Sequence, residues 1–323
     1  MSRSSMLLKK VKNIVFTLMI RQKLLVVLFF IFIFFSIVSE SFFTSRNIAV
    51  LLANSVVIGI AAIGMTFVMI GGGIDLSVGS ILLLSSAVGA SLMVKGVESG
   101  PGILIIITMG LFLGGINGFL IGRYKMPAFA VTLATMILYQ GITLAMTQAR
   151  TIYKMPSAFR YIGEGEIFGY PISIGVLAIF CIVGHMLLTK TSTGKRIYFV
   201  GNGLNIAKLC GINAGVIIFL TYLLSGLCAA VAGIILTARL NSVSVSTGGV
   251  TLVFDIVGAT VIGGTSIYGG EGTILGSLIG VLLLQTISNG LNLYGVSFFN
   301  QMIIKGGLIL FAVYLNTLRT MRS

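Results

Sequence analysis

The chain has 323 residues, of which 57% are hydrophobic and only 9% are charged, and its mean hydropathy is +1.11. Soluble domains carry about 25% charged residues, so this composition excludes a soluble globular protein and indicates a protein that crosses a lipid bilayer several times. The formal net charge of +14 does not indicate a nucleic-acid partner, because the basic residues cluster at the chain ends and in short links between apolar runs.

Continuous apolar runs predict an all-α, polytopic membrane protein with about ten transmembrane helices, because β-barrels show alternating segments of about ten residues instead. The runs lie at about 24–39, 48–70, 76–94, 103–122, 127–147, 172–188, 214–238, 252–262, 273–287 and 299–315. We therefore expect a basic cytoplasmic N-terminus (1–23), a single transmembrane domain (24–316) and a cytoplasmic C-terminus (317–323). This topology places 14 of the 21 Lys and Arg residues on the inner side, as the positive-inside rule requires.

The first glycine break, Gly71–Ser80, interrupts two apolar runs with three consecutive glycines and Asp75. Glycine weakens a helix, and irregular backbone at membrane depth occurs only where protein or water satisfies its polar groups. An ionisable residue between apolar flanks typically lines a pathway, so Gly72, Gly73, Asp75 and Ser77 are candidate pathway residues. Alternatively, Asp75 caps the helix that follows.

A second glycine break, residues 263–272, resembles the first in having a glycine pair followed by a carboxylate. Such similarity is either an internal repeat, which is common in transporters, or chance similarity between Gly-rich apolar segments. Asp255 precedes this break and also has apolar neighbours. It either lines a pathway or forms an internal ion pair.

Amide side chains recur within or beside the apolar runs, and they offer donors and acceptors without charge, which suits a neutral, polyhydroxylated substrate. The alternative is hydrogen bonding between helices. These amides are Asn54, Asn117, Gln140, Gln285, Asn292, Asn300 and Gln301. We select Asn54, Asn117, Asn292 and Gln301, together with Asp255 and the first break, as the predicted substrate pathway.

No catalytic or metal-binding pattern is present in the sequence. There is no Gly-x-x-x-x-Gly-Lys-Ser/Thr phosphate loop, which predicts that the chain does not itself hydrolyse ATP. The three cysteines have no zinc-ligand spacing. We expect a transport protein that is not an enzyme and needs no cofactor or metal of its own.

The inner segment 189–213 is longer than the other links and partly apolar. Asn202-Gly203 is a turn signal, and Asn205 is placed to cap a short helix over Ile206–Cys210. A short amphipathic helix of this kind either docks on a partner or lies on the lipid surface.

The motifs resemble those of permease subunits of ribose-type sugar ABC importers. The resemblance rests on Gly72-Gly73-Ile74-Asp75-Leu76-Ser77-Val78-Gly79-Ser80, Thr193-Gly194-Lys195-Arg196-Ile197-Tyr198, Ser225-Gly226-Leu227, Ile262-Gly263-Gly264-Thr265-Ser266 and Asn289-Gly290-Leu291-Asn292-Leu293-Tyr294-Gly295-Val296-Ser297. One departure is visible: the family tends to have Glu-Leu-Asp where this chain has Val253-Phe254-Asp255.

This resemblance implies a fold like that of type II ABC importers, a second permease copy in a homo- or heterodimer, a cytoplasmic ATPase that carries ATP and Mg²⁺, and an extracytoplasmic sugar-binding protein. It also implies that 189–213 contacts the ATPase, through Lys195, Arg196, Asn202, Asn205, Ala207, Leu209 and Gly211. We therefore expect a multi-pass protein of the bacterial inner membrane that imports ribose or a related pentose by alternating access. An ABC permease for autoinducer-2, branched-chain amino acids or another sugar is one alternative. An ion-coupled secondary transporter and a structural or assembly membrane protein are the others.

Overall fold

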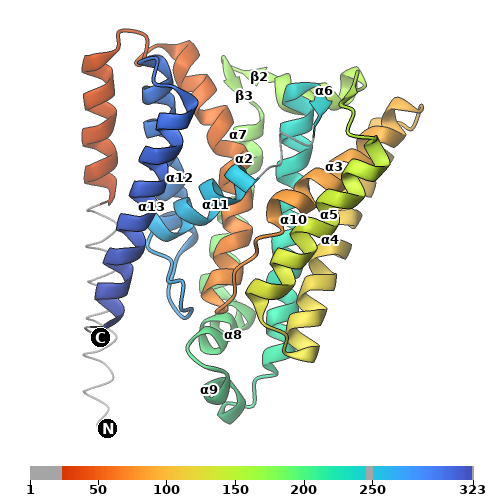
Figure 1. The fold of residues 1–323 in the computed structure, drawn as a ribbon, viewed down its shortest axis with the longest axis vertical. Coiled ribbons are helices and arrows are strands. Elements are labelled where there is room, and N and C mark those ends of the chain that lie inside the picture. The colour runs from red at the N-terminus through yellow and green to blue at the C-terminus, as the bar shows by residue number, and fades with distance from the viewer. Residues whose placement is uncertain (1–23, 245–249, 322–323) are drawn as a thin grey trace.

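The structure is a computed structural model that describes residues 24–244 and 250–321, and most of this chain is helical (Figure 1). Within these residues, six helices are long and apolar enough to cross a membrane: α2 (Ser45–Ile70), α4 (Ser99–Tyr124), α5 (Ala128–Thr147), α7 (Ser173–Lys190), α10 (Ala214–Leu240) and α12 (Ile274–Leu293). Shorter apolar stretches form the helix Leu24–Val38, α3 (Val78–Val94), α11 (Val250–Ile262) and the first part of α13 (Phe298–Met321).

Each of the ten predicted apolar runs coincides with one of these helices, so a predominantly helical, multi-pass membrane protein is confirmed. That all ten cross the bilayer stays a prediction, because four of the apolar stretches are shorter than a complete span. The predicted terminal segments 1–23 and 322–323 lie outside the described residues.

Helix α10 lies at the centre of the fold and packs against α2, α3 and α4. Its contact with α4 is close because glycines face it: a Cβ on Gly114 would lie 2.5 Å from the carbonyl oxygen of Tyr222, and one on Gly118 would lie 2.8 Å from that of Phe219. Small residues permit this approach of two backbones within a membrane protein. The larger buried side chains form a core cluster that joins α2, α3, α10 and α12.

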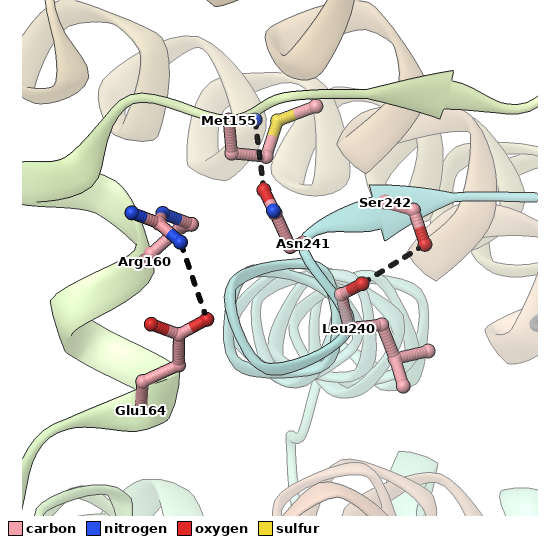
Figure 2. A network of polar contacts seen from close by, with 6 residues as sticks. All are labelled: Met155, Arg160, Glu164, Leu240, Asn241 and Ser242. Atoms are coloured by element: carbon pink, nitrogen blue, oxygen red, sulfur yellow. Dashed lines mark hydrogen bonds and ion pairs between the residues drawn. The ribbon is translucent and has the colours of Figure 1, made fainter.

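The loop between α5 and α7 contains small elements that the sequence did not predict: β1 (Ile152–Tyr153), α6 (Ser157–Glu164), β2 (Glu166–Ile167) and β3 (Tyr170–Pro171). β2 and β3 form an antiparallel hairpin, and β1 pairs with β4 (Ser242–Val243), which follows α10. Figure 2 shows how this loop is attached to the end of α10: the side-chain oxygen of Asn241 accepts from the backbone N–H of Met155 at 2.9 Å. On α6, Arg160 lies 3.8 Å from Glu164.

The two ends of the molecule differ in their elements (Figure 1). One end carries α6, β2 and β3. The other carries α8 (Ser192–Gly201), α9 (Leu204–Leu209) and the C-terminal end of α13. The segment 189–213 therefore lies at the same end as the last described turns of α13. The side of the membrane that this end faces stays a prediction.

Candidate functional site

The first glycine break is an irregular segment, residues 71–77, between α2 and α3. Gly72 has a φ of +85°, which side chains other than glycine rarely adopt. A Cβ on Gly73 would lie 2.5 Å from the phenolic oxygen of Tyr222. That hydroxyl donates to the carbonyl of Ile74 at 3.2 Å. The irregular backbone is thus satisfied by protein groups, as a membrane interior requires.

Asp75 is completely buried at this break and is held by serines. One carboxylate oxygen accepts from the backbone N–H of Ser77 at 3.0 Å and from its hydroxyl at 2.6 Å, and the other accepts from Ser225 Oγ on α10 at 2.7 Å. The amide nitrogen of Asn117 on α4 donates to Ser77 Oγ at 2.7 Å. A single carboxylate therefore connects the break to α4 and α10.

The structure changes the interpretation of these side chains. Asp75 does not cap α3, because it accepts from Ser77, which precedes the first helical residue, Val78. Asp75, Ser77 and Asn117 are all fully buried, so they line a pathway only in a conformation other than this one. Their predicted pathway role, and that of Gly72 and Gly73, stays a prediction.

The second glycine break, residues 263–272, lies in the connection between α11 and α12 and uses hydroxyl groups where the first uses a carboxylate. Thr66 of α2 donates to Ser277 Oγ at 2.7 Å, and Thr265 lies 3.2 Å from the same oxygen. The backbone N–H of Ser266 donates to the carbonyl of Glu271 at 2.9 Å and closes the loop. Hydroxyl contacts thus connect this break to α2.

Both breaks meet at the C-terminal end of α8. The N–H of Gly270 donates to the carbonyl of Ile70 at 2.9 Å, which joins the second break to the end of α2. A Cβ on Gly201 of α8 would overlap this same carbonyl, and a Cβ on Gly269 would lie 2.9 Å from Gly72 Cα and 2.7 Å from Gly201 O. Three backbone segments therefore touch at one junction that only glycines permit.

Tyr198 adds a polar contact between α8 and the second break. Its hydroxyl donates to the carbonyl of Gly272 at 2.7 Å. Burial raises the pKa of Tyr198 to about 12, so the phenol stays protonated and able to donate at neutral pH. A displacement of α8 would therefore change backbone contacts at both glycine breaks.

Helix α9 presents apolar side chains outward. Leu209 is 89% exposed, and Leu204 and Ile206 are also exposed. Exposed apolar groups on a short helix mark a contact surface. The sequence predicted a short helix here over Ile206–Cys210 with Asn205 as its cap. In the structure α9 instead begins at Leu204 after Gly203, and Asn205 lies inside it.

Six of the seven predicted coupling residues are accessible in the structure: Lys195, Arg196, Asn202, Asn205, Leu209 and Gly211. Ala207 is the exception, because it is fully buried in the main core cluster. It therefore holds α9 against the rest of the protein, and its side chain cannot contact a partner in this conformation. The exposed Leu204 and Ile206 were not among the predicted residues.

An amide-lined cavity of about 270 Å³ lies between α2, α12 and α13, and three of the predicted pathway residues meet there: Asn54, Asn292 and Gln301. The remaining lining residues are Val50, Gln285, Ser288, Asn289 and Phe298. None of these eight described residues carries a charge. The cavity can therefore offer hydrogen bonds to a small neutral molecule but no counter-charge.

Gln285 and Asn289 line the cavity but were not selected for the predicted pathway, although the sequence contains a signal for both. Gln285, Asn289 and Asn292 are spaced by four and then three residues on α12. Residues at this spacing share one face of a helix, so Gln285 and Asn289 belong with Asn292.

Asp255 on α11 forms an ion pair with Lys305 on α13, with 2.9 Å between the carboxylate oxygen and Nζ. The internal ion pair was one of the two interpretations of Asp255, and the structure shows it. Its place on the substrate pathway stays a prediction. The pair is partly buried, where a lost partner costs more than at a fully exposed site.

The protein is helical and polytopic, with two glycine breaks, an outward-facing helix at one end and an uncharged polar cavity. These features are those expected of a membrane permease. The family model for the permease component of branched-chain amino acid transport systems matches residues 47–313. The chain therefore belongs to this family of transport subunits, whose members are not enzymes.

Curated relatives agree with this assignment. The ribose import permease of Bacillus subtilis is 42% identical over 291 residues, covering 90% of both chains. The ribose import permease of Haemophilus influenzae is 38% identical, covering 91% of this chain and 92% of the relative, and the D-allose transport permease of Escherichia coli is 36% identical, covering 88% of both. No solved structure matches. The family resemblance indicated by the sequence motifs is confirmed.

Proposed function

We propose that the chain is the membrane subunit of an ABC importer that carries a neutral monosaccharide, ribose or a related pentose, across the bacterial inner membrane. Both termini face the cytoplasm. The working complex contains a second permease copy, a cytoplasmic ATPase that binds ATP and Mg²⁺, and an extracytoplasmic sugar-binding protein.

The observation that carries this proposal is the match to ribose permeases along about nine-tenths of the chain. The amide-lined cavity supports a neutral substrate. A zwitterionic amino acid would need partners for two opposite charges, because a buried unpaired charge is costly, and the eight cavity residues supply neither. The D-allose relative favours a hexose as the second candidate substrate.

The internal partners of the acidic groups argue against an ion-coupled transporter. Asp75 accepts hydrogen bonds on both oxygens, and Asp255 is paired with Lys305. Each carboxylate is thereby satisfied within the protein without a transported cation.

The proposed mechanism is alternating access driven through α9 and α8. The ATPase docks on the exposed apolar side chains of α9, and its movement shifts α8. Because α8 contacts both glycine breaks at Gly201, the shift changes α3, α11 and α12 together. The ATPase must bind the two states with different free energies for this to drive transport.

The first test is co-purification of the ATPase with the chain, using Leu209→Asp to place a charge on the most exposed apolar residue of α9. We expect the native chain to retain the ATPase and the variant to lose it. Ile167→Asp introduces the same charge at an exposed site on the β2–β3 hairpin at the opposite end, and it should retain the ATPase.

Uptake in vesicles completes this test. The native complex should accumulate labelled D-ribose only with ATP inside and the sugar-binding protein outside. Uptake by the chain without any ATPase or ATP would overturn the proposal, and Asp75 and Asp255 would then be candidates for ion coupling.

A further inference from the structure

Two of the cavity amides are oriented by hydrogen bonds to groups that do not line the cavity. The side-chain oxygen of Asn54 accepts from the guanidinium of Arg239 at 2.8 Å, which leaves its N–H₂ group free to donate into the cavity. The N–H₂ group of Gln301 donates to the carbonyl of Val296 at 2.9 Å, which leaves its oxygen free to accept. The two residues therefore present opposite polarity.

Asn289 connects two of the helices that line the cavity. Its amide forms two reciprocal hydrogen bonds with Asn47 of α2, each 2.9 Å long, and these join α2 to α12. Gln285, one turn earlier on α12, is only 7% exposed, and no hydrogen bond joins its amide to another described residue. A buried amide without partners loses the free energy of its hydrogen bonds unless a ligand or water supplies them.

The size and the lining of the cavity suit a small ring. Its volume of about 270 Å³ lies just below the range of about 300–1,000 Å³ that is usual for small-molecule pockets. Phe298 and Val50 add apolar surface beside the amides. A monosaccharide has this combination, with hydroxyls around its edge and C–H groups on its faces.

We propose that this cavity is a sugar-binding site within the permease, in which Asn54 donates to one hydroxyl of an aldose and Gln301 accepts from another. Gln285, Ser288 and Asn292 supply further neutral groups. This proposal rests on the proposed function and assigns the sugar a binding site between the soluble binding protein and the cytoplasm.

Arg239 is the positioning residue of this site. It does not line the cavity, but its hydrogen bond determines which end of the Asn54 amide faces inward. Without Arg239, the amide can rotate and present its oxygen, which cannot donate to a sugar hydroxyl. Its effect on the sugar therefore passes entirely through Asn54.

The test measures uptake of labelled D-ribose by vesicles that hold the permease, its ATPase and the sugar-binding protein. Asn54→Asp keeps the acceptor for Arg239 but removes the inward donor, and Gln301→Ala removes the inward acceptor. We expect each to raise the KM for the sugar-loaded binding protein or lower the rate about five- to tenfold, which is the effect of one lost hydrogen bond. Asn300→Ala changes the neighbouring, exposed amide on α13 and should transport normally.

Arg239 is tested by rescue. Arg239→Ala should reduce uptake as Asn54→Asp does, whereas Arg239→Gln, which retains an N–H donor, should restore most of it. A merely structural role for the charge would leave both variants equally impaired, and that result would overturn the positioning role.

A labelling experiment keeps the proposal testable if these variants assemble poorly. Ser288→Cys in a Cys210→Ser background places a thiol in the cavity, and D-ribose at high millimolar concentration should slow its reaction with a small methanethiosulfonate. Equal labelling rates with and without D-ribose would overturn the site.

The transport results separate the site from the proposed function. If Gln301→Ala and Asn54→Asp transport like the native complex, the site is also wrong while the proposed function stands. If the native complex takes up no sugar, the proposed function itself fails.

Discussion

The two glycine breaks both interrupt helices within the protein, but different contacts stabilise them. Each ends a helix inside the protein and begins another, and each touches α8 at Gly201. The first break has one glycine with positive φ, Gly72, and is held by the buried carboxylate of Asp75. The second break contains no buried Asp, and positive φ angles occur at Gly264, Gly269, Gly270 and Gly272.

This difference shows that irregular backbone in a membrane protein can be stabilised either by a side-chain acceptor or by turn geometry. A carboxylate fixes a short break rigidly, because three donors converge on it. Turns formed by glycine fix a longer break with less side-chain contact and with more conformational freedom. We therefore expect the first break to move as a unit with α4 and α10, and the second to deform.

The largest effect should come from the residue that both breaks share. In Gly201→Ala the new methyl group would overlap the carbonyl of Ile70 and lie 2.5 Å from the N–H of Gly270, so it would separate the two groups that join the breaks. We expect a loss of about 3 kcal/mol or more, as for severe overpacking. Thermal unfolding of the purified protein in detergent measures this.

Gly306→Ala is the matched control for this substitution. Gly306 lies on α13 with open space around its Cβ position, so alanine there should be neutral or slightly stabilising through helix propensity. Equal unfolding temperatures for the two variants would show that the junction at Gly201 is not tightly packed.

The next largest effect should come from the carboxylate of the first break. Asp75→Ala removes the acceptor for two hydroxyls and one backbone N–H and should cost about 3 kcal/mol, because buried donors are left unpaired. Asp75→Asn keeps one carbonyl oxygen and should cost less. If alanine and asparagine destabilise the protein equally, size rather than hydrogen bonding determines the effect.

The sequence predicted much of this arrangement because the signals are local. Apolar run length determines where helices form, and consecutive glycines beside Asp75 mark a break within a few residues. The short elements between α5 and α7 were missed because strands of two residues leave no periodic pattern. The predicted start of α9 was too late in the chain, because Asn205 is a good capping residue but lies inside the helix. The residue that precedes the helix is Gly203.

The contacts between distant segments could not be predicted in this way. The junction joins Ile70, Gly201 and Gly270, and no spacing in a single sequence shows that these residues meet. The same holds for Arg239, whose partner Asn54 lies 185 residues earlier. The cavity was partly predictable, because three of its amides were selected from residue type alone and the spacing of Gln285 and Asn289 on α12 extends that set.

The turn geometry of the second break gives a smaller effect. In Gly270→Ala the residue would keep a φ of +72°, which costs about 1–2 kcal/mol for an L-residue. Its methyl group would also meet the side chain of Asn202, 2.6 Å away, which can move aside because Asn202 is exposed. We expect a lower unfolding temperature than the native chain, but higher than Asp75→Ala. The reverse order would mean that the second break is the more rigid one.

The smallest effect should come from Tyr198→Phe, which removes only the hydrogen bond from α8 to Gly272 and keeps the ring. One neutral hydrogen bond contributes about 1 kcal/mol, so the fold should be nearly unchanged. The substitution should affect coupling between ATP hydrolysis and transport, because the hydrogen bond joins α8 to the second break and does not involve the first.

We expect the ATPase to remain bound to Tyr198→Phe while sugar uptake per ATP hydrolysed falls. Tyr161→Phe, on exposed α6 at the opposite end, removes a hydroxyl far from the junction and should leave that ratio unchanged. Equal ratios in the two variants would show that α8 transmits movement through the Gly201 backbone contacts alone.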